Sequence, residues 1–269
     1  MISRRQLLAA LPTCLLPARA DADVDPSWRP RGLDLREIHV EGTQSRRFVL
    51  GVPTDLALGE RAPLLVLLHG LGETGDEHAG AWAWFERYGL GTSYDRLRAR
   101  GTMRGLVLAC PYMPNLPIAD PRAFDAYARW IVEAVVERAR REAPVLDASS
   151  FTYLCGCSLG GHFSLEVMLR QANVFAAWGG VQTAVSEQAG ERYARRLADA
   201  FTQSGPRAVL VETSTADPFR AGSVRLSTAL ARAGIANTFV ELPGPHDQQW
   251  LRASGTERML AWFDGLSRP

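Results

Sequence analysis

The chain contains no lysine, so all 30 residues counted as lysine plus arginine are arginines. This absence excludes mechanisms that need a lysine amine, such as Schiff-base or pyridoxal-phosphate chemistry, a Walker-A phosphate loop and a Ser-Lys dyad. An excess of one charge is also lacking, because 29 acidic residues balance the 30 arginines. Without a long basic run we expect no nucleic-acid partner. The chemistry must rest on serine, histidine, cysteine, aspartate, glutamate or arginine.

Cysteine is scarce, with four in 269 residues. Cys14 lies near the N-terminus, and the other three are Cys110, Cys155 and Cys157. Such a sparse set does not make a disulfide framework, and the spacing of Cys155 and Cys157 would strain a bridge between them. We expect the last three to pack as small buried hydrophobic residues.

Residues 1–20 combine a basic start, a short apolar stretch and a small-x-small end at Ala18-Arg19-Ala20, which are the parts of an export signal. The apolar stretch is too short for a permanent membrane span. Ser3-Arg-Arg-Gln-Leu-Leu8 is typical of twin-arginine export. We predict cleavage after Ala20 and a periplasmic or secreted protein. General secretory export and an intact cytosolic N-terminus are the alternatives.

A linker rich in proline, arginine and aspartate follows at 21–34, and one catalytic domain is predicted over 35–269. Segments 35–40 and 46–52 flank turn residues and predict an antiparallel hairpin. Six apolar runs then alternate with helix-length segments, which indicates a mostly parallel sheet with helices on both faces. The runs are 64–68, 106–110, 151–157, 175–178, 208–212 and 237–242, and the main helices are expected at 121–141, 159–170, 187–201, 222–233 and 248–266.

Gly156-Cys-Ser158-Leu-Gly160 lies between a predicted strand and a predicted helix. A nucleophile on a tight strand-to-helix turn needs small residues two positions to each side, so that strand and helix pass closely and its side chain projects from the sheet. The N–H at the start of the helix then faces a developing oxyanion. Ser158 is therefore the candidate nucleophile, and a turn with a capping serine is the alternative.

On these residues the sequence resembles the α/β-hydrolases, and among them serine esterases of the carboxylesterase, phospholipase or polyhydroxyalkanoate depolymerase type. Leu65-Val-Leu-Leu-His69-Gly-Leu-Gly72 resembles their H-G-x-G segment, in which a strand ends in the loop that supplies an oxyanion donor. The resemblance covers nearly all of the chain from the hairpin onward and implies a three-layer α/β-hydrolase sandwich with an eight-stranded sheet. It also implies that the N–H groups of Leu71, or alternatively Gly72, and Leu159 form the oxyanion hole, and that His69 orients the loop.

A serine nucleophile needs a base and an acid. His246 follows the last predicted strand in a Pro/Gly loop, at the sheet edge where open α/β sheets bind ligands. His162, one turn into the helix after Ser158, is the rival base. Asp217 comes just after the strand at 208–212, whereas Asp199 and Glu187 fall on helices, Glu212 falls within the strand, and no acid follows the strand at 175–178. Ser158, Asp217 and His246 stand in the chain order that this fold uses.

We therefore predict an exported serine hydrolase that cleaves small-molecule esters or polyesters through an acyl-enzyme intermediate, without a metal or organic cofactor. Polyester depolymerase, thioesterase or acyltransferase, and peptidase are alternatives on the same triad. A catalytically silent binding scaffold is the alternative from another class.

Clues to the substrate are fewer. Trp82 lies off the apolar face of a helix expected around 81–90, and we hypothesise that it lines the substrate pocket. Tyr112 and Met113, with Leu116, follow the strand at 106–110 and are further wall candidates. In a chain without lysine, positive charge at the pocket mouth must come from arginine, and Arg220 is the nearest candidate to Asp217 in sequence.

Overall fold

The computed structural model describes residues 28–41, 46–118 and 120–267. The predicted export signal at 1–20 and the first half of the predicted linker, 21–27, lie outside the described residues. Within the described part of the chain, no helix has the length and hydropathy to cross a membrane. The first strand begins at Leu33, two residues before the predicted domain boundary.

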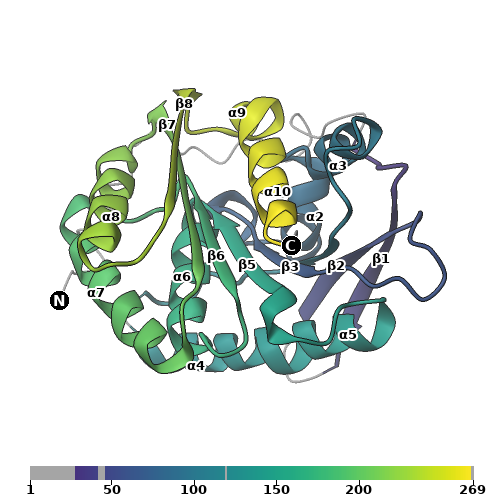
Figure 1. Ribbon diagram of the computed structural model, residues 1–269, viewed down its shortest axis with the longest axis horizontal. Helices are drawn as coiled ribbons and strands as arrows, with labels where there is room; N and C mark the ends of the chain where they lie inside the picture. Colours follow the sequence, from purple (N-terminus) through teal and green to yellow (C-terminus); the bar gives the residue numbers. More distant parts are fainter. Residues whose placement is uncertain (1–27, 42–45, 119, 268–269) are drawn as a thin grey trace.

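Eight strands form one sheet in the order β1-β2-β4-β3-β5-β6-β7-β8 (Figure 1). The pairs β1–β2 and β2–β4 are antiparallel, and all others are parallel. The predicted mostly parallel sheet with an N-terminal antiparallel hairpin is therefore confirmed. The strands are β1 (Leu33–Val40), β2 (Arg46–Pro53), β3 (Leu64–Leu68), β4 (Val107–Pro111), β5 (Thr152–Cys157), β6 (Ala177–Val181), β7 (Ala208–Ala216) and β8 (Thr238–Pro245).

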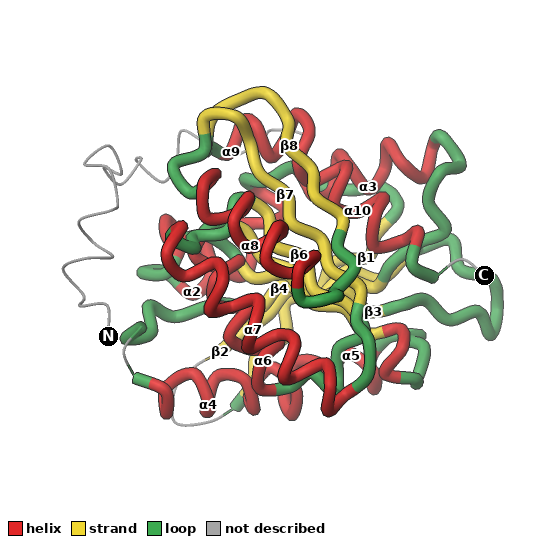
Figure 2. Tube along the Cα trace, turned by 60° about the vertical axis from the view of Figure 1, so that its left-hand side comes forward, coloured by secondary structure: helices red, strands yellow, loops and turns green. Residues whose placement is uncertain are grey.

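Helices cover both faces of this sheet, as Figures 1 and 2 show. One face carries α4 (Pro121–Trp130), α5 (Glu137–Glu142), α6 (Leu159–Arg170), α7 (Glu187–Ser204) and α8 (Arg220–Arg232). The other carries α2 (Glu77–Glu86), α3 (Leu90–Ala99), α9 (Gln248–Trp250) and α10 (Thr256–Gly265). Two separate hydrophobic cores result, one on each face of the sheet.

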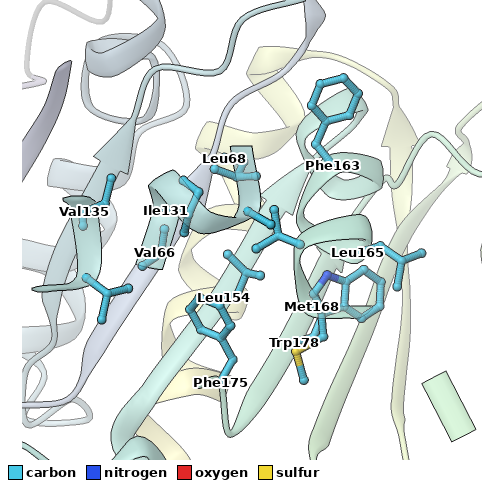
Figure 3. Packing of buried hydrophobic residues seen from close by; sticks show 14 of the residues in the cluster. Val66, Leu68, Ile131, Val135, Leu154, Phe163, Leu165, Met168, Phe175 and Trp178 are labelled. Carbon is cyan, nitrogen blue, oxygen red and sulfur yellow. The ribbon is translucent and has the colours of Figure 1, made fainter. Parts of the chain in front are cut away.

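The central strands are buried from end to end, as expected for parallel strands covered on both faces. Val66 and Leu68 of β3 and Leu154 of β5 lie in one cluster with Phe163 of α6 (Figure 3). In the same cluster Trp178 of β6 donates its indole N–H to Ser164 Oγ at 3.0 Å. Burying this polar group costs little because it is paired.

Two predicted helices are interrupted only by π-helical turns. One turn, Ile131–Val136, joins α4 to α5, and the other, Leu251–Gly255, joins α9 to α10. The helix expected around 81–90 is instead two helices, because Gly89 adopts a left-handed conformation (φ 72°) between α2 and α3. Helix α3 was not predicted, although its buried residues Leu90, Tyr94 and Leu97 have helical spacing among polar neighbours.

The three cysteines of the described chain are free and buried, which confirms that they pack as small hydrophobic residues. The loops after β3, β5, β7 and β8 all leave the same edge of the sheet, because these strands are parallel to one another. That edge carries the segments that follow Leu68, Cys157, Ala216 and Pro245, and it therefore holds the predicted site residues.

Candidate active site

Ser158 stands on a sharp turn between β5 and α6. Its backbone has φ 52° and ψ −118°, in a region that residues other than glycine rarely adopt. A Cβ on Gly156 would lie 2.2 Å from the carbonyl oxygen of Gly160, and one on Gly160 would lie 2.2 Å from that of His69. The two glycines are required because strand, helix and neighbouring loop approach one another this closely. Strain at such a turn is typical of functional sites.

His246 connects the other two predicted residues. Its Nε2 lies 3.0 Å from Ser158 Oγ, and its Nδ1 lies 2.8 Å from Asp217 Oδ1. The Asp217 side chain is fully buried and also accepts hydrogen bonds from Thr213 Oγ1 (2.7 Å) and the Phe219 N–H (2.9 Å). As an acceptor, Asp217 places the imidazole proton on Nδ1 and leaves Nε2 free to accept from the Ser158 hydroxyl.

The rival histidine, His162, does not share this arrangement. It is buried on α6 beside Phe163, and its ring makes an edge contact with Tyr193 of α7 at 5.6 Å. Burial lowers the pKa of His162, because it disfavours the cationic form. His162 thus belongs to the packing between α6 and α7.

The loop after β3 passes directly over Ser158. A Cβ on Gly70 would lie 3.9 Å from Ser158 Cβ, and Leu71 begins a short 3₁₀ turn, Leu71–Glu73. Leu159 is the first residue of α6. Within residues 28–41, 46–118 and 120–267, the N–H groups of Leu71 and Leu159 donate to no other group. Both are available to a ligand.

His69 fixes the orientation of this loop. Its Nδ1 donates to the Gly70 carbonyl oxygen at 2.8 Å, and its Nε2 accepts from the Met113 N–H at 2.8 Å. In a trans peptide the C=O and the following N–H point in opposite directions, so the bond to Gly70 directs the Leu71 N–H away from His69. Burial lowers the pKa of His69 to about 4, which keeps the ring neutral at neutral pH.

Two predicted substrate residues have other contacts. The Met113 side chain is fully buried in the hydrophobic core, which removes it from contact with a substrate. Trp82 donates its indole N–H to Glu37 Oε2 of β1 at 2.7 Å and packs its ring against Trp28. Since three strands separate β1 from β5, about 19 Å of sheet lies between them. The structure therefore attaches Trp82 to the edge of the sheet and does not bring it to Ser158.

Tyr112 remains partly exposed near the loop after β3. Its ring stacks on His69 with centroids 5.9 Å apart, and its hydroxyl donates to the Thr74 carbonyl oxygen at 2.7 Å. It therefore supports this loop. Arg220, expected as a source of positive charge at the pocket mouth, is paired with Glu241 of β8 at 2.7 Å.

Sequence reasoning missed four polar residues that contact the site. The side chains of Glu73 and Tyr88 are buried beneath the loop after β3. Gln182 directly follows β6, and Gln248 lies two residues after His246. Glu73 directly follows the H-G-x-G segment, which was a signal that could have identified it. Loop glutamines have no periodicity or motif by which to recognise them.

The chain matches no family model and no curated protein. Solved structures match its fold at low identity. A ferulic acid esterase superposes with a TM-score of 0.70 at 16% identity, over 87% of this chain and 98% of its own. The feruloyl esterase module of Clostridium thermocellum has a TM-score of 0.69 at 13% identity, over 91% and 94%. S-formylglutathione hydrolase from Staphylococcus aureus has a TM-score of 0.66 at 14% identity, over 86% and 99%.

These neighbours share the layered architecture with this chain over nearly their whole length. The strand order, the N-terminal antiparallel hairpin and the strand-to-helix turn at Ser158 are those expected of an α/β-hydrolase. The chain has the α/β-hydrolase fold.

Proposed function

We propose that the chain is a serine hydrolase of carboxylic esters, with Ser158 as nucleophile, His246 as general base and Asp217 as the acid of the triad. The observation that carries this proposal is the unbroken series of hydrogen bonds from Asp217 through His246 to Ser158, at 2.8 and 3.0 Å. A catalytically silent binding protein would not need the hydrogen-bonded series from Asp217 to Ser158, nor a strained backbone at the serine.

In the first half of the reaction, Ser158 Oγ attacks the ester carbonyl carbon while its proton passes to His246 Nε2. Asp217 stabilises the resulting imidazolium. The N–H groups of Leu71 and Leu159 hold the oxyanion, and each such donor contributes about 3 kcal/mol to lowering the barrier. The tetrahedral intermediate collapses, the C–O bond to the alcohol breaks, and His246 returns the proton to the departing alcohol.

Water completes the cycle. His246 removes a proton from a water molecule, which attacks the acyl carbon of the Ser158 ester, and the second tetrahedral intermediate releases the carboxylic acid. Ser158 recovers its proton from His246. No redox step or additional co-reactant enters this balance.

The structural neighbours suggest which esters to test. Their names include ferulic acid and feruloyl esterases and an S-formylglutathione hydrolase. A useful panel therefore contains p-nitrophenyl esters of increasing acyl length, methyl ferulate, an S-acyl glutathione, a short polyester and a p-nitroanilide. Their relative kcat/KM values would separate esterase, thioesterase, depolymerase and peptidase activity.

A fluorophosphonate probe tests the proposed nucleophile directly. We expect the probe to label Ser158, and we expect Ser158→Ala and His246→Ala to abolish both labelling and p-nitrophenyl acetate turnover. Labelling that persists in Ser158→Ala, or a folded wild-type protein that neither reacts nor turns over any ester, would overturn the proposal.

Export is proposed from residues 1–20 alone. N-terminal sequencing of the protein from the periplasm or medium should begin at Asp21, and an intact Met1 on soluble cytoplasmic protein would contradict export. Replacing Arg4-Arg5 by lysines should block export if the twin-arginine route is used, and should have little effect on general secretion.

A further inference from the structure

A buried carboxylate lies behind the proposed oxyanion loop and has no part in the mechanism above. Glu73, the last residue of the 3₁₀ turn that Leu71 begins, is only 3% exposed. Its Oε2 accepts a hydrogen bond of 2.6 Å from the hydroxyl of Tyr88, which is also 3% exposed. Carboxylates are seldom buried this deeply unless they are paired, so the contacts of Glu73 carry information about its role.

Tyr88 links this carboxylate to the backbone beside the nucleophile. While its hydroxyl donates to Glu73, the same oxygen accepts from the Gly70 N–H at 3.1 Å. The His69 ring holds the Gly70 carbonyl from the other side. Both polar groups of Gly70 are thus fixed, and with them the peptide that carries the Leu71 N–H.

The second carboxylate oxygen faces the other half of the site. Glu73 Oε1 lies 3.4 Å from Nε2 of Gln248 and 3.5 Å from Nη1 of Arg87. Gln248 is the first residue of α9 and stands two positions after His246. One carboxylate therefore contacts the segment that carries the base directly, and reaches Gly70, in the loop that offers the oxyanion donor, through the Tyr88 hydroxyl.

The charges in this network oppose one another. Burial raises the pKa of Glu73, whereas the hydrogen bond from Tyr88 and the positive charge of Arg87 lower it, and burial outweighs them. His69 Nδ1 is also within 4.0 Å of Glu73 Oε2. A protonated carboxyl keeps part of its acceptor capacity, so Tyr88 and Gln248 can donate to Glu73 in either protonation state.

We infer that Glu73 is a positioning residue that holds the oxyanion loop and the His246 segment in register, through Tyr88 on one side and Gln248 on the other. This inference rests on the proposed ester hydrolysis. Because the network touches no reacting atom, it acts through the placement of the Leu71 N–H and of His246. A small misplacement of such groups is sufficient to lower the rate of the chemical step.

Tyr88→Phe is the sharpest test, since it removes one hydroxyl and keeps the aromatic packing. We expect kcat for p-nitrophenyl acetate to fall by about tenfold to a hundredfold with little change in KM. Inhibition by an aryl trifluoromethyl ketone, which forms a tetrahedral adduct with an oxyanion, should weaken by the same factor as kcat/KM. Inhibition by the product carboxylate should not follow this factor.

Glu73→Gln and the double variant complete the experiment. If the two residues act as one unit, the double variant should lose little more activity than either single variant. Tyr153→Phe is the matched control, because Tyr153 is a buried tyrosine of the same hydrophobic core as Tyr88 that packs on Phe263, and its hydroxyl has no hydrogen-bond partner among the described residues. Its kcat should match the wild type. If Glu73→Gln fails to fold, Tyr88→Phe alone decides the matter.

The outcomes separate this inference from the proposed function. Wild-type protein without ester turnover or fluorophosphonate labelling would overturn the function itself. An active wild type together with a folded Tyr88→Phe whose kcat and ketone inhibition are unchanged would overturn only the role of Glu73. A fall in melting temperature with unchanged kcat would assign the network to stability and likewise overturn the inference.

Discussion

The side-chain amide of Gln182 donates a hydrogen bond of 2.8 Å to the carbonyl oxygen of Pro245, the residue directly before His246. The same amide nitrogen lies 2.7 Å from Ser214 Oγ, and Ser214 in turn donates to Pro245 at 2.9 Å. Gln182 follows β6 with a φ of 48°, which costs a residue with a Cβ about 1–2 kcal/mol. A strained residue that joins the ends of three strands beside His246 indicates a constraint on the position of that histidine.

Replacing Gln182 by leucine should therefore lower activity more than stability. The variant keeps a side chain of similar size but loses both amide contacts, and we expect kcat/KM for p-nitrophenyl acetate to fall about tenfold. Gln203→Leu, on the exposed end of α7, is the control and should leave kcat/KM unchanged. Equal rates for the wild type and Gln182→Leu would show that His246 is held without the amide.

Local patterns sufficed to predict the sheet and the residues of the candidate triad. Ser158 follows a continuous apolar strand and is flanked by spaced glycines, and both features can be recognised within ten residues of sequence. Asp217 and His246 each follow a predicted strand, and parallel strands bring their carboxyl ends to one edge. The structure places His246 within hydrogen-bonding distance of both Ser158 and Asp217, because the parallel strands that precede the three residues end at the same edge of the sheet.

Contacts between distant segments could not be predicted in this way. Trp82 was identified only as lying off an apolar helix face, while the contact that holds it comes from Glu37, 45 residues earlier. Met113 carries no sign in the sequence that its side chain points into the core. Gln182 and Gln248 contact distant segments through isolated side-chain hydrogen bonds, and such bonds leave no periodic pattern.

Trp82→Ala should lower stability and leave substrate preference unchanged. The indole hydrogen bond to Glu37 and the ring contacts with Trp28 and Phe85 would be lost, which should reduce the free energy of unfolding by about 2–3 kcal/mol, below the cost for a fully buried tryptophan. Urea unfolding measures this loss, and kcat/KM across p-nitrophenyl esters of increasing acyl length should keep the wild-type profile. A loss of kcat/KM confined to long or short esters would show that Trp82 lines the substrate pocket after all.

Glu166 should make the protein sensitive to acid. Burial raises the pKa of Glu166, but hydrogen bonds and charges from Arg196, Tyr193 and Arg170 outweigh burial and lower it to about 2. Because the folded pKa lies below the usual glutamate value of 4.5, ionised Glu166 stabilises the fold above about pH 4.5, and this contribution, about 3 kcal/mol, is lost as the pH falls toward 2.

Urea unfolding from pH 7 to pH 3.5 tests this contribution. Glu166→Gln should be markedly less stable than the wild type at pH 7, and the difference should shrink as the pH falls. Glu137→Gln, which removes the partly exposed ion pair with Arg140, should change stability at pH 7 by less than about 1 kcal/mol. A Glu166→Gln deficit that stays constant over this range would contradict the assignment.

Glu212, in contrast to Glu166, should make the protein less stable as the pH rises. It is fully buried on β7, and neither carboxyl oxygen has a hydrogen-bond partner among the described residues. Burial raises the pKa of Glu212 to about 8, although the charge of Arg258 lowers it. The folded protein therefore keeps a proton that the unfolded chain releases, and stability falls by up to about 1.4 kcal/mol per pH unit as the pH rises from about 4.5 to about 8.

Removing the Glu212 carboxyl group should remove this dependence of the free energy of unfolding on pH. In Glu212→Gln the free energy of unfolding should change less between pH 5 and pH 8 than in the wild type, so the variant gains relative stability as the pH rises. Glu212→Leu should share the flatter profile and also relieve the unpaired polar atoms. Because the carboxyl group lies on the strand before Asp217 and not in the triad, ester turnover at pH 7 should persist in both variants. Parallel stability profiles for the three proteins would show that Glu212 is already ionised in the folded state.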